Sequence, residues 1–341
     1  MAVEKRINSI NMPLRPIFIL SLPRSGSTLL QRMMMTSEVV DSIAEPWILL
    51  PLIYARRSHG QISEYDHRVS SSAIREFASN LPAGNRDFDE LIHDFAIAAY
   101  SKACKKKSRY FVDKTPRYYL IIDELERIFP EGVFVFLFRH PLSIVSSILR
   151  SWCQNSFLHL HLFEQDIRDG QRLLTDAFSG MDGRPNVFRL NYERIVKDPE
   201  ETLFQLYDAL DLPLDKTGLN GFLRQDIRGS MGDKIGKAAY KEIETRSIDI
   251  WKETFNNRFR KHFVIKYLTE IGKMRLSVQG YDNKAILEDV DGLEMVKGCA
   301  MRDLAGYMMS KMYRFLGGAI YRARLTTSEY PGKICTYSEF R

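Results

Sequence analysis

Ile17-Phe-Ile-Leu-Ser-Leu-Pro-Arg-Ser-Gly-Ser-Thr-Leu-Leu30 is the stretch that decides the fold. Its first part, Ile17–Leu22, is nearly all apolar, which predicts a buried strand. A turn of small residues follows, and the apolar periodicity from Thr28 predicts a helix to Met35. A strand that leads through such a turn into a helix can hold a phosphate, because several backbone N–H groups converge there and the helix dipole favours an anion. The sequence therefore predicts a P-loop-like anion-binding loop over Pro23–Thr28.

The loop differs from that of nucleotide kinases and GTPases in the position of its positive charge. Those proteins read G-x-x-x-x-G-K-[ST], and their lysine reaches the β- and γ-phosphates. Here Ser27 stands at the lysine position, and Arg24 supplies a cation earlier in the loop. The form Pro-Arg-Ser-Gly-Ser-Thr resembles the 5′-phosphosulfate loop of sulfotransferases, which bind 3′-phosphoadenosine 5′-phosphosulfate (PAPS), and is nearest to the branch with tyrosylprotein and many bacterial sulfotransferases. The resemblance implies a phosphosulfate-binding loop with cofactor contacts from Arg24, Ser25, Gly26, Ser27 and Thr28.

Composition places the chain among ordinary globular proteins. It has 341 residues, of which 45% are hydrophobic and 27% charged. The net charge of +6 suits a small polyanionic ligand, whereas a nucleic-acid-binding protein would more often carry a basic stripe with interleaved aromatic residues. The four cysteines are scattered and form no cluster with metal-ligand spacing, so no metal is expected. No secretion signal or membrane-spanning run is evident, and a cytoplasmic location is expected.

Strands and helices alternate along the chain, which predicts a doubly wound α/β fold around a parallel sheet. The strand expected at Gly132–Arg139 is apolar on both faces, as a central strand covered by helices requires. The other later strands are expected at Val39–Ile43, Tyr110–Val112 and Val187–Leu190. Flanking helices are expected at Ile48–Arg57, Ser71–Asn80, Asp89–Lys102, Arg117–Phe129 and Pro141–Trp152, with another from Pro199. Ligands of such folds bind beyond the carboxyl ends of the strands, where the motifs described below fall.

The resemblance also suggests a division of the chain. Residues 1–273 are expected to form a sulfotransferase-like domain with a helical insertion at residues 48–102. Residues 274–341 form a helical C-terminal extension outside the resemblance, in which Ala300–Arg324 is expected to be an amphipathic helix with basic residues. Packing of this helix on the core is the favoured interpretation, and contact with a partner or a membrane surface is the alternative.

The second motif is Arg139-His-Pro-Leu-Ser-Ile-Val-Ser-Ser147, which joins the central strand to the next helix. Ser143 and Ser147 lie four residues apart and therefore share a helix face. A guanidinium donates two parallel hydrogen bonds to phosphate oxygens, so Arg139 is suited to an anion. The motif resembles the sulfotransferase 3′-phosphate site, which implies that Arg139 and Ser147 bind the 3′-phosphate of PAPS. The alternative is that Arg139 pairs with an acid. His140 is expected to pack at the start of the helix.

Two later segments carry further resemblance. Tyr192 is a candidate to bond the 3′-phosphate or to stack near the adenine, and Glu193 is expected to be structural. The segment Gly229–Lys237 combines glycines with lysines and resembles the late basic loop that caps the nucleotide in the family. Lys234 and Lys237 are therefore candidate cofactor ligands.

Two polar motifs, Asp-Lys-Thr-Pro around Lys114 and Glu-Pro-Trp from Glu45, each follow a predicted strand. The resemblance implies that Lys114 contacts the sulfuryl group or the bridging oxygen and stabilises charge there together with Arg24. It also implies that Glu45 is the base that takes the acceptor proton, a role that requires a pKa raised toward the working pH. A structural ion pair or helix cap for Glu45 and a surface turn for Lys114 stay open, and Asp113 is a weaker candidate for the base.

Together the motifs predict an enzyme that moves a sulfuryl group from PAPS to a hydroxyl or amine. The alternatives are an ATP-dependent small-molecule kinase of P-loop type, which the missing loop lysine disfavours, and a non-catalytic nucleotide-binding protein. The acceptor is left open among small molecules, glycans and peptides. Residues 48–102 and Asn155–Gln171, with His159 and His161, are expected to shape its pocket. No nucleic-acid partner is expected, and the oligomeric state is left open.

Overall fold

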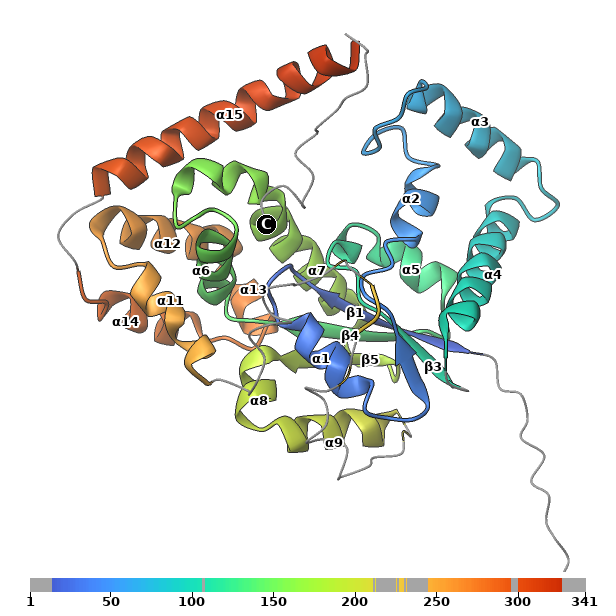
Figure 1. The fold of residues 1–341 in the computed structure, drawn as a ribbon, viewed down its shortest axis with the longest axis horizontal. Coiled ribbons are helices and arrows are strands. Elements are labelled where there is room, and N and C mark those ends of the chain that lie inside the picture. The colour runs from blue at the N-terminus through green and yellow to red at the C-terminus, as the bar shows by residue number, and fades with distance from the viewer. Residues whose placement is uncertain are drawn as a thin grey trace, which may run out of the picture.

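The centre of the molecule is a five-stranded sheet in the order β2-β3-β1-β4-β5, and each neighbouring pair is parallel. This computed structural model describes residues 14–105, 108–210, 212, 225, 227–229, 231, 245–295 and 300–326. The strands are β1 (Arg15–Ser21), β2 (Val40–Ser42), β3 (Tyr110–Asp113), β4 (Val133–Phe138) and β5 (Val187–Asn191). Helices lie on both faces of the sheet (Figure 1), so the predicted doubly wound α/β fold is confirmed.

The helices follow the strands in the predicted alternation. The α-helices are α1 (Ser27–Met34), α2 (Leu49–Tyr54), α3 (His67–Ser79), α4 (Asn85–Ala103), α5 (Ile122–Ile128), α6 (Pro141–Ser151), α7 (Gln171–Met181), α8 (Tyr192–Lys197), α9 (Pro199–Ala209), α11 (Ile250–Thr254), α12 (Arg258–Ile271), α13 (Lys273–Val278), α14 (Asn283–Asp291) and α15 (Ala300–Thr326). Shorter helical turns are η1 (Tyr118–Leu120), η2 (Phe157–Leu162), η3 (Gln165–Gly170) and η5 (Thr245–Ile248).

The order of the strands creates one crevice at the carboxyl end of the sheet. The chain leaves β1 toward β2 on one side and leaves β4 toward β5 on the other, although β1 and β4 are neighbours. Their connections therefore diverge, and ligands of open α/β sheets bind at such a switch point. Ser21 of β1 is paired with Leu137 of β4, so the loop after Pro23 and the corner at Arg139 both open at this place.

Alternation of side chains along β1 separates two apolar cores. Ile17 and Ile19 belong to the core on the side of α1, α8 and α9, whereas Phe18 and Leu20 belong to the larger core on the side of α5, α6, α7 and α12. Successive strand residues point to opposite faces, so a strand covered on both sides must be apolar throughout. This is why the sequence shows β1 and β4 as continuous apolar runs.

The helix predicted over Arg117–Phe129 is interrupted, and this prediction was wrong in detail. The chain forms η1, leaves helical geometry at Ile121 and starts again as α5. Tyr118 and Tyr119 explain the break, because the hydroxyl of the first donates to Asp113 and that of the second to Asp166. Adjacent positions of an α-helix point about 100° apart, so one continuous helix would not bury both tyrosines on these carboxylates.

The C-terminal helices pack against the body of the fold. Arg260 of α12 and Asp303 of α15 form a buried ion pair of 2.7 Å, and Gly280 lies against Asn191 at the end of β5. The helix expected over Ala300–Arg324 is present as α15, which lies along the outer edge of the fold beyond α12 (Figure 1). Within the described ranges, none of the helices combines the length and apolar character needed to cross a bilayer.

Candidate functional site

The loop between β1 and α1 turns sharply at two residues. Arg24 and Gly26 have positive φ angles of 68° and 88°. A Cβ atom at Gly26 would lie 2.2 Å from the Tyr192 ring, so the position requires glycine both for its backbone conformation and for the close approach of the ring. The first N–H groups of α1 have no acceptor within the helix, which leaves them available to an anion.

Arg139 is buried beside this loop, at the carboxyl end of β4. Its Nη1 donates to the Arg24 carbonyl at 2.8 Å and its Nη2 to the Ser247 carbonyl at 2.9 Å. The guanidinium lies 4.1 Å from the centroid of the Tyr192 ring, whose hydroxyl is 2.9 Å from the Ser247 hydroxyl. Arg139 is 7% exposed, and among the described residues its Nε has no hydrogen-bond partner and no carboxylate pairs with it. A buried cation without a counter-ion is costly, so this corner is suited to an anion.

The side chain of Arg24 joins the loop to α6. Its Nε donates to Ser147 Oγ at 2.9 Å and its Nη2 to Ser151 Oγ at 3.4 Å, while the guanidinium lies 5.4 Å from the Trp152 ring centroid. Ser143 Oγ instead donates to the Ile248 carbonyl at 3.2 Å. The loop and the corner at the start of α6, two motifs more than 110 residues apart in the sequence, are therefore adjacent in space.

Glu45 and Lys114 form a buried ion pair at the carboxyl ends of β2 and β3. Lys114 Nζ donates to Glu45 Oε1 at 2.8 Å. The Lys114 side chain is 2% exposed and the Glu45 side chain is 10% exposed. Trp47 Nε1 donates to the other carboxylate oxygen at 3.1 Å. The structure thus forms the ion pair that the sequence left open for Glu45, and it places Lys114 in the interior rather than in a surface turn.

Asp113 supports this arrangement from behind. It accepts hydrogen bonds from the hydroxyls of Tyr100 at 2.6 Å, Tyr118 at 2.8 Å and Thr115 at 3.0 Å. Burial raises the pKa of Asp113 to about 6, although these three donors oppose the shift. Thr115 Oγ1 in turn accepts a hydrogen bond from the backbone N–H of Trp47 at 3.3 Å. Trp47 has a positive φ of 59°. Asp113 is enclosed by donors and holds the turn that carries Glu45.

His140 and Glu193 take structural positions, as expected. The His140 ring stacks on Trp251 with centroids 5.0 Å apart, and burial lowers the pKa of His140 to about 4. The Glu193 carboxylate accepts from the His140 N–H at 2.9 Å and from the Tyr281 hydroxyl at 2.7 Å. Together these contacts fix the start of α6, which follows Arg139.

The remaining candidate residues have different outcomes. Ser25, Ser27 and Thr28 are buried in the loop and the first turn of α1, and Ser25 Oγ has no hydrogen-bond partner within the ranges that the structure describes. Lys234 and Lys237 lie outside the described residues. His161 contacts α15, because its backbone N–H donates to the Ser310 hydroxyl at 2.8 Å.

Sequence reasoning missed three contributors to the site. Ser247 reaches Arg139 from η5, more than 100 residues later, and no local pattern marks it. Trp152 was recognised only as a helix end. Ser151 could have been found, because it follows Ser147 by four residues and therefore shares its helix face.

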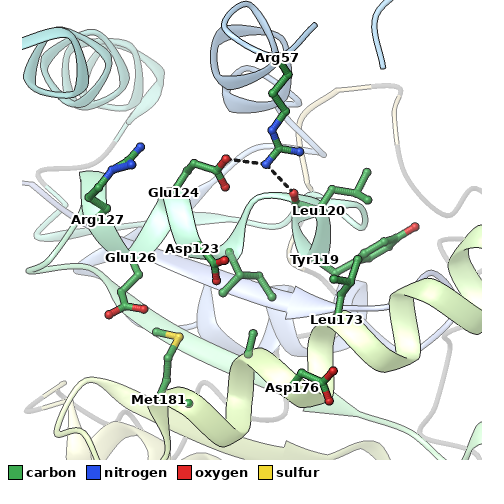
Figure 2. Close-up of a pocket in the computed structure, with 13 residues that line it drawn as sticks. Arg57, Tyr119, Leu120, Asp123, Glu124, Glu126, Arg127, Leu173, Asp176 and Met181 are labelled. Carbon is green, nitrogen blue, oxygen red and sulfur yellow. Dashed lines mark hydrogen bonds and ion pairs between the residues drawn. The ribbon is translucent and has the colours of Figure 1, made fainter. Parts of the chain in front are cut away.

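A pocket of about 510 Å³ lies elsewhere, between α5 and α7. Figure 2 shows Arg57 above it, with its guanidinium donating to Glu124 and to the Leu120 carbonyl. Other acids of its wall are paired as well, Asp176 with Arg275 and Glu126 with Arg184. None of the predicted site residues that the structure describes lines this pocket, and most of its charged side chains are already paired.

Comparison with known proteins agrees with the geometry of the crevice. A model described as the sulfotransferase family matches residues 16–216. The chain belongs to the sulfotransferase family. This result confirms the resemblance and does not favour the kinase alternative.

Relatives and solved structures of the family are distant. Nodulation protein NoeE of Sinorhizobium fredii is 26% identical over 258 residues, which cover 69% of this chain and 59% of that protein. A protein-tyrosine sulfotransferase of Drosophila melanogaster is 23% identical over 286 residues, 82% of this chain and 54% of that protein. The chain thus spans less than two thirds of the length of these two relatives. The sulfotransferase domain from the curacin biosynthetic pathway has a TM-score of 0.53 and 22% identity, with coverage of 79% of this chain and 98% of that domain, and therefore shares the fold.

Proposed function

We propose that this protein transfers a sulfuryl group from PAPS to a hydroxyl or amine of an acceptor. Membership in the sulfotransferase family supports the reaction class. The observation that carries the cofactor assignment is Arg139, a buried guanidinium without a carboxylate partner among the described residues, beside a loop that opens at the switch point of the sheet. The buried Ser25 Oγ and Arg139 Nε find no partner in the part of the chain that the structure describes, so the crevice fits a ligand with phosphate oxygens.

Two groups of residues are proposed to bind the two anionic ends of the nucleotide. Arg139 and Ser147 would hold the 3′-phosphate, and Tyr192 would fix the guanidinium plane of Arg139 from behind. The first N–H groups of α1, with Ser25, Ser27 and Thr28, would hold the 5′-phosphosulfate. Arg24 bridges the two subsites through its contact with Ser147.

Bound PAPS would supply an activated sulfuryl group whose bond to the bridging oxygen breaks as the acceptor attacks. Lys114 is proposed to turn from Glu45 toward that oxygen and stabilise the charge that develops there. Its departure removes a cation from the Glu45 carboxylate, which then accepts a proton from the acceptor more readily. Trp47 keeps the carboxylate in place through its indole N–H.

The acceptor is proposed to reach Glu45 from the side of the helical region at residues 48–102. The named activity of the tyrosine sulfotransferase relatives makes a tyrosine peptide one reasonable member of an acceptor panel, beside glycans and small alcohols. We also propose that PAPS is used without a metal, because the residues that would stabilise charge are Arg24, Lys114 and the loop N–H groups.

The cofactor assignment is tested by calorimetry with 3′-phosphoadenosine 5′-phosphate (PAP) and with AMP, which lacks the 3′-phosphate. Arg139→Met is expected to weaken PAP binding at least a hundredfold and AMP binding far less, because only the first ligand carries the group that Arg139 would hold. Arg189→Met is the matched control, since Arg189 lies on β5 and donates to the Val278 carbonyl at the surface. Unchanged PAP affinity in a folded Arg139→Met protein would refute the assignment.

Turnover is tested separately with radiolabelled PAPS and the acceptor panel. Label transferred to an acceptor supports the proposed reaction. ATP hydrolysis or phosphoryl transfer with magnesium would instead favour the kinase, and tight PAP binding without transfer to any acceptor would favour a non-catalytic nucleotide-binding protein.

A further inference from the structure

Helix α15 is held to the protein by its polar side. Asp303 is buried and pairs with Arg260 of α12, which also donates to the Asn155 side chain at 3.0 Å. Two turns further along the helix, Ser310 is buried, and its hydroxyl accepts a hydrogen bond from the His161 backbone N–H. A surface helix normally turns its apolar stripe to the core, so this orientation is the reverse of the usual one.

A second ion-pair group fixes the next part of the helix. Glu164 follows η2 and is 2% exposed, and it accepts from Lys311 at 2.7 Å and from Arg314. These two cations lower the pKa of Glu164 against the opposing effect of its burial. The inner side of α15 is therefore held by these charged and polar groups together with one aromatic side chain, Tyr307, whose ring lies 5.8 Å from that of Phe259 and 5.7 Å from that of Phe263 between centroids.

The opposite side of α15 is apolar and exposed. Its residues recur at intervals of three and four, so they form one stripe, which we call the outer face. Phe315 is 87% exposed and Met301 79%, values far above those of ordinary packed side chains. The outer face consists of Met301, Leu304, Ala305, Met308, Met309, Met312, Phe315 and Leu316. Figure 1 shows α15 at the rim of the fold, with α6 and α12 on one side only.

The charges of the helix indicate what covers the outer face. Residues 300–326 contain five lysines and arginines and a single acid, Asp303, which is buried against Arg260. Arg302 lies on one flank of the outer face by helical spacing. On the other flank Lys311, together with Arg314, shares the single negative charge of Glu164, so this flank also keeps a net positive charge. Two copies of this helix would bring like charges together without an exposed acid to balance them. An anionic lipid surface instead complements both the basic flanks and the apolar stripe.

We propose that α15 lies in the plane of an anionic phospholipid surface, with the outer face inserted among the acyl chains. Methionine side chains are flexible and polarisable and suit a fluid apolar environment. The inner ion pairs with Arg260 and Glu164 keep the helix on the protein, so the whole domain is carried to the membrane surface. This binding site is independent of the nucleotide crevice.

Co-sedimentation of the full chain with vesicles tests the proposal. We expect binding to vesicles of equal phosphatidylcholine and phosphatidylglycerol, at least tenfold weaker binding to pure phosphatidylcholine, and partial loss at raised salt. Met308→Ser/Phe315→Ser is expected to weaken the anionic-vesicle partition at least tenfold, because both side chains leave water on insertion. Phe77→Ser/Phe95→Ser is the matched control, since these aromatic residues of α3 and α4 are 59% and 53% exposed. An unchanged unfolding midpoint and PAP affinity show that both variants are folded.

Three results would overturn the proposal. The first is absence of binding to the anionic vesicles, and the second is equal partition of the test variant and the wild type. The third is a concentration-dependent dimer that the same double substitution abolishes, because the outer face would then be an interface between two copies.

Discussion

Gly26→Ala is the substitution whose effect the structure defines most sharply. The new Cβ atom would lie 2.2 Å and 2.4 Å from two carbons of the Tyr192 ring, so the ring would have to move by about 1.3 Å to reach an ordinary contact distance. The ring is restrained by the Arg139 guanidinium and by the contact of its hydroxyl with Ser247. We expect Gly26→Ala to lower the free energy of unfolding through two effects. The left-handed backbone conformation should cost about 1–2 kcal/mol, and overpacking against the ring should cost about 1–3 kcal/mol.

Chemical unfolding in urea measures this effect, and Gly183→Ala is the matched control. Gly183 also has a positive φ, 82°, but a Cβ atom there would meet nothing within 4 Å, so only the backbone cost of about 1–2 kcal/mol is expected. A double-mutant cycle with Tyr192→Ala isolates the contact with the ring, and a coupling of about 1–3 kcal/mol is expected. The reasoning is refuted if Gly26→Ala costs no more than Gly183→Ala, or costs the same with and without the ring.

Three further predictions concern the buried charges. Lys114→Met should lower the free energy of unfolding by about 3–5 kcal/mol, because it leaves the buried Glu45 without its cation. Adding Glu45→Gln should recover part of this loss in urea unfolding. If the two substitutions have additive costs instead, the two side chains do not stabilise one another. The folded pKa of Asp113, about 6, exceeds its ordinary value of 3.8, so its stabilising contribution of about 3 kcal/mol is full below pH 3.8 and is lost as the pH rises to about 6. Asp113→Asn should remove this part of the pH dependence. If the slope of the unfolding free energy against pH between those values stays the same in the variant, Asp113 is not its source. Arg260→Met should destabilise by about 3–5 kcal/mol and speed protease cleavage within α15, since Asp303 would stay buried without a cation; unaltered cleavage would show that other contacts hold the helix.

Local patterns in the sequence determined the sheet and the position of the loop. The apolar runs of β1 and β4, the small residues around Gly26 and the proline at the start of α6 depend on neighbours within a few residues. Because parallel strands present their carboxyl ends at one edge of the sheet, the sequence alone also predicted that Arg139 lies near the loop. Helix caps were used less well: Asp66 caps α3, which begins at His67, four residues before the start at Ser71 that the apolar spacing suggested.

Tertiary structure alone decided which polar groups meet. Glu45 and Lys114 are 69 residues apart, and whether each finds the other, water or a ligand depends on how two strand ends lie side by side. The reversed orientation of α15 is of the same kind, because a helix pattern shows two faces and does not say which one meets the core. Arg260 and Glu164 decide this from elements far away in the sequence. Backbone conformation follows from short-range sterics and periodicity, whereas the pairing of buried charges follows from packing over long sequence distances, and for this reason the sequence determined the scaffold and the fold determined the contacts within it.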